Sequence, residues 1–293
     1  MPEPRPAISI ATPGGDLAGP LHRTAHHAMG ATFEILISDQ AADYAAQAAH
    51  AAFEELDRLD RELSRFIPAS DVAQINRLRP GDAVRVGIAA MECLLAAARL
   101  GAETRGAFDV TAGSPGGACM DHVVFREAEH AVGIRAEGVR IDLGGIGKGY
   151  ALDRLAEVLD DWSIQAALLH AGESTALALA APQGRAGWPA GLRAPDADAA
   201  TLGRVRLDHR ALSGSAARMR GPHILDPRTG RPATGAAGAW ALAPTAAESD
   251  ALATAFFVMT PDEIRAYVQT HPHVAGAVAP AEGPLRQFGN WET

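Results

Sequence analysis

The sequence predicts an α+β fold, because segments typical of strands and of helices alternate irregularly along the chain. The strand-like segments alternate apolar and polar residues, whereas the helix-like segments carry apolar residues at helical spacing. The connections mix hairpin-like and crossover types, which disfavours a regular doubly wound sheet. No fixed-period repeat is present. With 293 residues and 47% apolar content, the chain is long enough to bury a sizeable core.

We expect residues 23–293 to form a single domain that follows a flexible N-terminal extension. Residues 1–22 are rich in proline and glycine, as loose termini often are. They lack the basic start and unbroken apolar stretch of a secretory signal, and they contain no lipobox. No segment reaches the roughly 18 apolar residues that span a bilayer. We therefore expect a cytoplasmic protein without membrane insertion.

The charge balance disfavours nucleic acid as a partner. The chain has 35 acidic and 26 basic residues and a net charge of -9. A polyanion is held by a clustered basic face, which this composition does not favour. The two cysteines, Cys93 and Cys119, are too few for a disulfide framework or a cysteine-rich metal cage.

The first third of the chain predicts one strand and two helices. Residues 32–38 alternate apolar and polar side chains and predict a half-buried strand. Residues 49–63 carry apolar side chains at helical spacing, with charged residues opposite, and predict a long amphipathic helix. Residues 87–103 predict another helix, which ends at a glycine-rich loop.

The segment IDLGGIGKGYALD predicts a strand, a tight turn and a helix. Val139, Ile141 and Leu143 alternate as in a strand that runs into the glycines. The residues after the glycines have the apolar spacing of a helix. Further on, we expect strands at 164–172, 204–209 and 239–244, helices at 247–259 and 261–271, and a loop at 181–200.

Two interpretations fit this glycine turn equally well when it is considered alone. Glycines between a strand and a helix allow close approach of an anion such as phosphate, which the helix N-terminus favours. The turn could instead only let the helix pack on the sheet, with Lys148 in solvent. The spacing of a P-loop fails at Asp142 and Gly149, and a dinucleotide fingerprint fails at Tyr150.

The segment HILDPRTGRP places His223 three residues before Asp226 in a rigid turn. A histidine held in this way can serve as a general base, because its reference pKa lies near working pH. The alternative is an ordinary Asp-Pro turn with a packed histidine. For an isolated motif, this alternative is favoured.

Asp250 and Thr254 lie four residues apart on a predicted helix and so share one face. Both present oxygen, the donor that a hard cation such as Mg²⁺ prefers. Asp250 could instead cap the helix while Thr254 bonds back to a carbonyl, which the spacing alone favours. We expect Asp250 at an exposed helix position, where substitution leaves the fold intact.

Six segments in a fixed order carry a resemblance that no single motif supplies: MGATFEI, LSRFIPASDVAQIN, GAFDVTAG, IDLGGIGKGYALD, HILDPRTGRP and SDALATAFFVM. Together they resemble the FAD:protein FMN transferase family, the ApbE-like flavin transferases, from about residue 26 to residue 260. The resemblance implies a T-fold-like α+β architecture with mixed or antiparallel sheets and packed helices.

The resemblance also implies the site residues. The positions that match family contacts to FAD are Met29, Phe66, Ala107, Phe108, Asp109, Asp142, Lys148, His223 and Ile224. The positions that match the metal site are the carbonyl of Gly145, the carboxylate of Asp250 and the hydroxyl of Thr254. Mg²⁺ is the expected metal, and Mn²⁺ also suits hard oxygen ligands. His223 and Asp250 are the expected catalytic residues.

The implied activity is transfer of the FMN part of FAD to a Ser or Thr hydroxyl of a target protein, as a phosphoester, with release of AMP. FAD and a flavin-accepting protein are thus the expected partners. The segment 113–140 is shorter than we expect for this family, which motivates an alternative, a metal-dependent FAD pyrophosphatase that gives FMN and AMP. A further alternative is a non-catalytic FAD-binding module.

Overall fold

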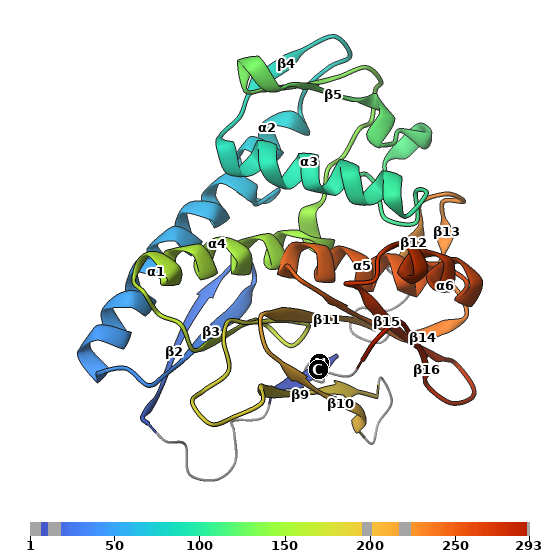
Figure 1. The fold of residues 1–293 in the computed structure, drawn as a ribbon. Coiled ribbons are helices and arrows are strands. Elements are labelled where there is room, and N and C mark those ends of the chain that lie inside the picture. The colour runs from blue at the N-terminus through green and yellow to red at the C-terminus, as the bar shows by residue number, and fades with distance from the viewer. Residues whose placement is uncertain (1–6, 11–18, 195–200, 217–223, 292–293) are drawn as a thin grey trace, which may run out of the picture.

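The computed structural model of the chain describes residues 7–10, 19–194, 201–216 and 224–291. An eight-stranded sheet forms its centre, with helices on one face and a three-stranded sheet on the other (Figure 1). The predicted α+β class is confirmed. Within the described ranges, no helix combines the length and the apolar character needed to span a bilayer.

The large sheet is antiparallel between all of its neighbouring strands. The strand that we predicted at 32–38 lies near one edge, and those predicted at 164–172 and 239–244 lie inside the sheet. In spatial order the strands are β16 (Arg286–Phe288), β15 (Ala275–Pro280), β14 (Ala236–Ala243), β11 (Arg210–Ala216), β8 (Thr175–Ala178), β7 (Ala167–Ala171), β3 (Ala31–Ser38) and β2 (Leu21–Ala28).

Helices cover one face of this sheet and bury the larger hydrophobic cluster. The helices on the sheet are α1 (Ala42–Leu63), α4 (Gly147–Asp161), α5 (Ala246–Val258) and α6 (Pro261–Thr270), and α3 (Ile88–Glu103) packs on α1 and α5 farther from the sheet. Helix α5 lies against β11 and β14 and also contacts α3 and α4, so it is buried on nearly every side. Asp250 is only 5% exposed as a result, and the prediction of an exposed position is wrong.

The opposite face carries a small sheet of β1 (Ile8–Ile10), β9 (Trp188–Arg193) and β10 (Thr201–Leu207). The predicted extension over residues 1–22 therefore contains ordered structure, since β1 pairs with β9 and β2 begins at Leu21. The buried Trp240 indole donates a hydrogen bond to the Ala7 carbonyl at 2.7 Å, which ties β1 to the large sheet. Strand β9 also lies within the loop that we predicted at 181–200, so that prediction is wrong.

A smaller layer lies beyond the helices, at the top of Figure 1. It contains α2 (Asp71–Ile75) and an antiparallel sheet of β4 (Ala83–Arg85), β6 (Ala131–Ile134) and β5 (Val123–Arg126). A short hairpin of β12 (Leu225–Asp226) and β13 (Arg231–Pro232) completes the strands. The 3₁₀ helices are η1 (Pro115–Gly117), η2 (Met120–His122), η3 (Glu127–Glu129) and η4 (Leu143–Gly145).

The strand predicted over residues 139–143 is absent from this described segment, although its apolar side chains are buried as expected. The side chain of Asn76 satisfies both backbone groups of Ile141, at 2.6 and 2.9 Å. The Asp142 amide donates to the Val110 carbonyl at 2.7 Å. Because a side chain and a loop take these hydrogen bonds, the segment enters the glycine turn without a neighbouring strand.

Helices α4 and α5 approach each other most closely at Gly149. A Cβ placed on Gly149 would lie 2.1 Å from the carbonyl oxygen of Ala246, the first residue of α5. Real side chains do not approach backbone atoms so closely, so only glycine fits this crossing. Gly149 therefore sets how α4 and α5 are placed relative to each other.

We expect Gly149→Ala to lower the free energy of unfolding by about 1–3 kcal/mol, because the added methyl group must push the two helices apart. Urea denaturation of the variant and the wild-type chain measures this difference. Gly147→Ala, on the same helix, is the matched control, since its Cβ would come no closer than 3.4 Å to the surrounding side chains of Leu143 and Met29. Equal unfolding free energies for the two variants would contradict the close crossing at Gly149.

Candidate active site

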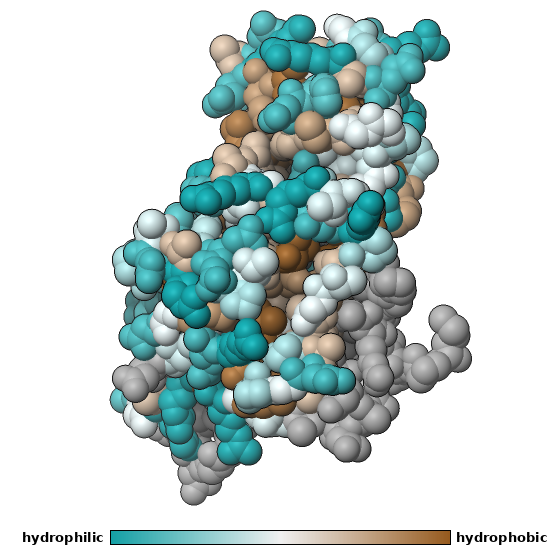
Figure 2. Space-filling view, turned by 90° about the vertical axis from the view of Figure 1, so that its right-hand side faces the viewer, coloured by the Kyte–Doolittle hydropathy of each residue, from teal (hydrophilic) through white to brown (hydrophobic). Residues whose placement is uncertain are grey.

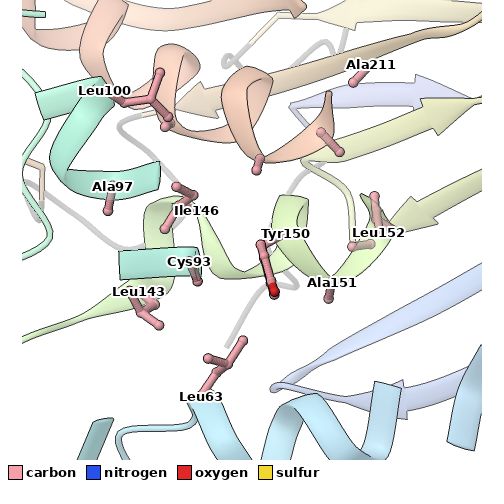
Figure 3. Packing of buried hydrophobic residues seen from close by; sticks show 14 of the residues in the cluster. Leu63, Cys93, Ala97, Leu100, Leu143, Ile146, Tyr150, Ala151, Leu152 and Ala211 are labelled. Atoms are coloured by element: carbon pink, nitrogen blue, oxygen red, sulfur yellow. The ribbon is translucent and has the colours of Figure 1, made fainter. Parts of the chain in front are cut away.

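Two segments that are distant in the sequence meet where α4 begins. One is the η4 turn with the first residues of α4, which follow it directly, and the other is the first turns of α5. Figure 3 shows Leu143 and Ile146 of the turn packed in one apolar cluster with Cys93 of α3 and Tyr150 of α4. This packing fixes the glycine turn against α3 and brings its polar groups next to α5.

The carboxylate of Asp250 is the centre of this junction. Its Oδ1 accepts a hydrogen bond from the Thr175 hydroxyl at 3.0 Å. Its Oδ2 accepts one from the Gly149 amide at 3.3 Å and lies 3.5 Å from Nζ of Lys148. A buried carboxylate is costly unless donors or a cation compensate it, and these three groups do so.

Lys148 contacts both the glycine turn and α5. Its Nζ donates to the Gly144 carbonyl at 3.4 Å and pairs with Asp250, and its side chain is 21% exposed. Lys148 is the only lysine in the sequence, whereas 25 positions carry arginine. An ammonium is a compact point charge, unlike the broad planar guanidinium. Lys148 is thus the one side-chain ammonium of the chain.

Thr254 lies one turn beyond Asp250 and faces the glycine turn. Its Oγ1 is 3.4 Å from the Asp250 carbonyl oxygen and 3.4 Å from Oγ of Ser215. A Cβ on Gly145 would lie 3.2 Å from the same Oγ1 and 3.2 Å from the ring of Phe108. The structure therefore brings together the three positions predicted to hold a metal, with Phe108 beside them.

The three predicted metal positions offer a carboxylate, a hydroxyl and a backbone carbonyl, which is a set of hard oxygens that suits Mg²⁺. Among the residues that the structure describes, no group of three or more His, Cys, Asp or Glu side chains could hold a metal. The predicted set contains a single carboxylate, so this result does not conflict with it.

Two other predicted flavin contacts lie beside the turn. Met29 occupies the tight connection between β2 and β3 with a φ of 52°, and its Cε is 3.5 Å from the Cβ position of Gly147. Its amide donates to Asp60 Oδ2 at 3.1 Å, which holds this unusual backbone conformation. Ala107 is buried next to Phe108 in the loop that follows α3.

Asp142 shapes the turn and connects it to an exposed aromatic side chain. Its Oδ1 accepts from the Gly144 amide at 3.0 Å, and its Oδ2 lies 3.3 Å from the Arg65 guanidinium. Arg65 in turn lies 4.6 Å from the centre of the Phe66 ring, which is 79% exposed. Phe66 is thus linked to the turn through Arg65, and its predicted contact with flavin stays a prediction.

The remaining predicted residues are less closely connected to the junction. Asp109 accepts hydrogen bonds from Thr111 and from the Met120 amide, so it organises its own loop. The Ile224 carbonyl accepts from the Ala233 amide at 2.9 Å. His223 lies outside the described residues. The predicted roles of these three residues therefore stay predictions.

Asp153 and Thr175 also belong to this junction but were not predicted from the sequence. Asp153 lies four residues after Gly149 on α4, and this helical spacing was a usable signal that the two share a face. Thr175 comes from β8, far from Asp250 in the sequence, and no local pattern identifies it. Only the folded chain brings Thr175 next to Asp250.

Asp153 fixes the N-terminus of α5. Its two carboxylate oxygens accept hydrogen bonds from the amides of Ala246 and Ala247 at 2.7 and 2.8 Å. Burial raises the pKa of Asp153 to about 7, and these two amide bonds only partly offset that effect. Asp153 thus joins α4 to α5 one turn away from the Gly149 crossing.

A cavity of about 440 Å³ lies beside Asp153 rather than at the predicted flavin residues. Its wall includes Glu92, Tyr150, Arg154 and His209, and none of the residues predicted to contact FAD or metal lines it. The polar groups that converge around Asp250 thus lie outside the lining of this cavity.

Comparison with known proteins agrees with this fold. Residues 29–278 match the ApbE family, and the chain belongs to this family. A FAD:protein FMN transferase of Treponema pallidum is 32% identical over 164 residues, which are 50% of this chain and 45% of that protein. One from Escherichia coli K12 is 25% identical over 252 residues, 73% of this chain and 72% of that protein.

Solved structures show the same architecture. The ApbE protein of Thermotoga maritima aligns with a TM-score of 0.81 and 26% identity, over 92% of this chain and 97% of that one. The Pseudomonas stutzeri flavinyl transferase ApbE aligns with a TM-score of 0.80 and 22% identity, over 92% and 95%. The predicted ApbE-type architecture is confirmed. In sequence, the match to the Treponema relative spans less than half of that protein.

We expect the stability of the wild-type chain to fall, relative to Asp153→Asn, as pH rises from about 4 to about 7. The folded-state pKa of Asp153 is raised from 3.8 to about 7, so the folded chain retains a proton that the unfolded chain releases in this range. Asparagine cannot titrate. Urea unfolding of both proteins across this pH range measures the difference, and parallel pH profiles would contradict the raised pKa.

Proposed function

We propose that this chain transfers the FMN part of FAD to a Ser or Thr hydroxyl of a target protein and releases AMP, with the help of Mg²⁺. One observation carries the proposal. In a chain of the ApbE family, Lys148 of the glycine turn and Asp250 of α5 lie 3.5 Å apart, with Thr254 and Gly145 beside them. Relatives in this family bear the name FAD:protein FMN transferase.

The proposed reaction makes one bond and breaks one. The oxygen of the acceptor hydroxyl bonds to the FMN phosphorus, the bridging P–O bond of the diphosphate breaks, and AMP leaves with the bridging oxygen. The hydroxyl proton passes to a base, and His223 is our proposed base. Catalysis then depends on positioning and on compensation of the negative charge that moves onto AMP.

The chain's own groups supply much of this compensation. The ammonium of Lys148 lies beside the Gly144 carbonyl of the glycine turn, where it can offset the charge of the diphosphate. The carboxylate of Asp250, the hydroxyl of Thr254 and the carbonyl of Gly145 would hold the cation. Mg²⁺, or Mn²⁺ in its place, would polarise a phosphoryl oxygen and stabilise the leaving group.

The direct test is to incubate the full chain with FAD, MgCl₂ and a purified flavin-accepting domain, and to record the intact mass of that domain. Covalent FMN on the acceptor, with matching AMP release, supports transfer. FMN and AMP that appear at the same rate without any acceptor would indicate a pyrophosphatase instead. FAD that stays intact under both conditions would indicate a binding module.

We expect Asp250→Asn to lower the transfer rate at fixed Mg²⁺ by about 100-fold or more, since a bound metal contributes several kcal/mol to such reactions. Asparagine keeps the size of this buried side chain, so circular dichroism and thermal unfolding should still report a folded chain. A normal transfer rate in the folded variant would rule out Asp250 as a metal ligand.

We expect Lys148→Met to weaken FAD affinity by about 10-fold or more, because a hydrogen bond to a charged group contributes about 1.5–3 kcal/mol. Flavin fluorescence titration without metal measures this affinity. Lys148→Arg keeps the charge but not the compact shape, so we expect only partial recovery. Wild-type affinity in Lys148→Met would mean that Lys148 does not contact the nucleotide.

A further inference from the structure

Three hydroxyl side chains of the large sheet lie along α5. Thr175 of β8 pairs in register with Ser213 of β11, so both side chains share one face of the sheet, and Ser215 follows two residues later on that face. Thr175 donates to Asp250, and Ser215 lies 3.4 Å from Thr254. The two α5 side chains of the proposed metal site, Asp250 and Thr254, thus each contact a hydroxyl of the sheet.

The Thr175 hydroxyl is the more rigidly held of the two side-chain groups that contact the Asp250 carboxylate. Thr175 is 0% exposed, and its strand lies inside the sheet between β7 and β11. A β-branched side chain in a strand has few accessible rotamers. Lys148, by contrast, reaches Asp250 through a long, partly exposed side chain.

The hydrogen bond from Thr175 also orients the carboxylate of Asp250. With Oδ1 bonded to Thr175, the other oxygen, Oδ2, faces the Gly149 amide and Lys148 at the start of α4. Without the hydroxyl, only the Gly149 amide at 3.3 Å and the partly exposed Lys148 would hold the carboxylate, so its rotation about the last side-chain bond would be less restricted. Groups that hold a ligand through hydrogen bonds commonly raise metal affinity by 10–100-fold.

We propose that Thr175 is a positioning residue, which holds Oδ1 of Asp250 so that Oδ2 is presented to the divalent cation. This inference rests on the proposed function, because it assumes that Asp250 binds the metal. Thr175 touches neither the substrate nor the metal in this scheme, and it acts only through Asp250.

Ser213 provides a matched control within the same sheet. It is as deeply buried as Thr175 and adjacent to it in register, yet its Oγ has no hydrogen-bond partner among the described residues. Ser213→Ala therefore removes a buried hydroxyl from the same layer without removing a contact to Asp250.

The test compares Thr175→Val, Thr175→Ser and Ser213→Ala with the wild-type chain. Calorimetric titration of MgCl₂ into the FAD-loaded protein measures metal affinity, and transfer rates across a range of Mg²⁺ concentrations give the half-saturating value. We expect Thr175→Val to raise both constants by about 10–100-fold. Its rate should approach that of the wild type at saturating Mg²⁺. Thr175→Ser should restore both constants, and Ser213→Ala should leave them within about 2-fold.

A purely structural role for Thr175 gives a different result, namely a lower rate at every Mg²⁺ concentration without a change in metal affinity. That outcome, or unchanged affinity in Thr175→Val, overturns the proposal. Thermal unfolding checks that each variant is folded, and Thr175→Ala replaces Thr175→Val if the latter does not fold.

Asp250→Asn separates failure of this inference from failure of the proposed function. If Thr175→Val keeps wild-type metal affinity while Asp250→Asn loses it, Asp250 remains a ligand and only the role of Thr175 fails. If Asp250→Asn also keeps wild-type affinity, the metal assignment in the proposed function fails, and the role of Thr175 fails with it.

Discussion

The crossing of α4 and α5 at Gly149 is the constraint on which the site depends. Because no side chain separates the two backbones there, the glycine turn that begins α4 is held directly against the first turns of α5. Asp153 strengthens the same crossing by binding the first amides of α5. The position of Lys148 relative to Asp250 therefore follows from backbone packing, and does not depend on flexible side chains alone.

A second consequence concerns the cost of burying Asp250. A helix that is covered on nearly all sides is an unfavourable place for a carboxylate, and the chain compensates it from α4 and from β8. The effect extends further, because burial and the nearby Asp250 charge both raise the pKa of the Cys93 thiol on α3. The site thus gathers its polar groups inside the larger apolar cluster.

Much of the fold was accessible from the sequence, because long segments with strong periodicity specify their own structure. The helix predicted at 247–259 is α5, Ala246–Val258, within one residue. The alternation at 139–143 correctly indicated burial but not pairing, since Asn76 replaces the neighbouring strand. The prediction that Asp250 is exposed was wrong, because helical spacing assigns residues to one face of a helix without showing what covers that face. Thr175 could not be found, because its contact forms only in the folded sheet.

The single lysine has a chemical consequence beyond its contacts. In most proteins, reagents that acylate side-chain amines modify many scattered positions, and the effects at any one of them are diluted. Here such a reagent has only one side-chain target, and that target lies beside the buried carboxylate at the centre of the junction. Acylation would remove its positive charge while leaving every arginine intact. Among the side chains, susceptibility to amine acylation is therefore confined to one atom, Nζ of Lys148.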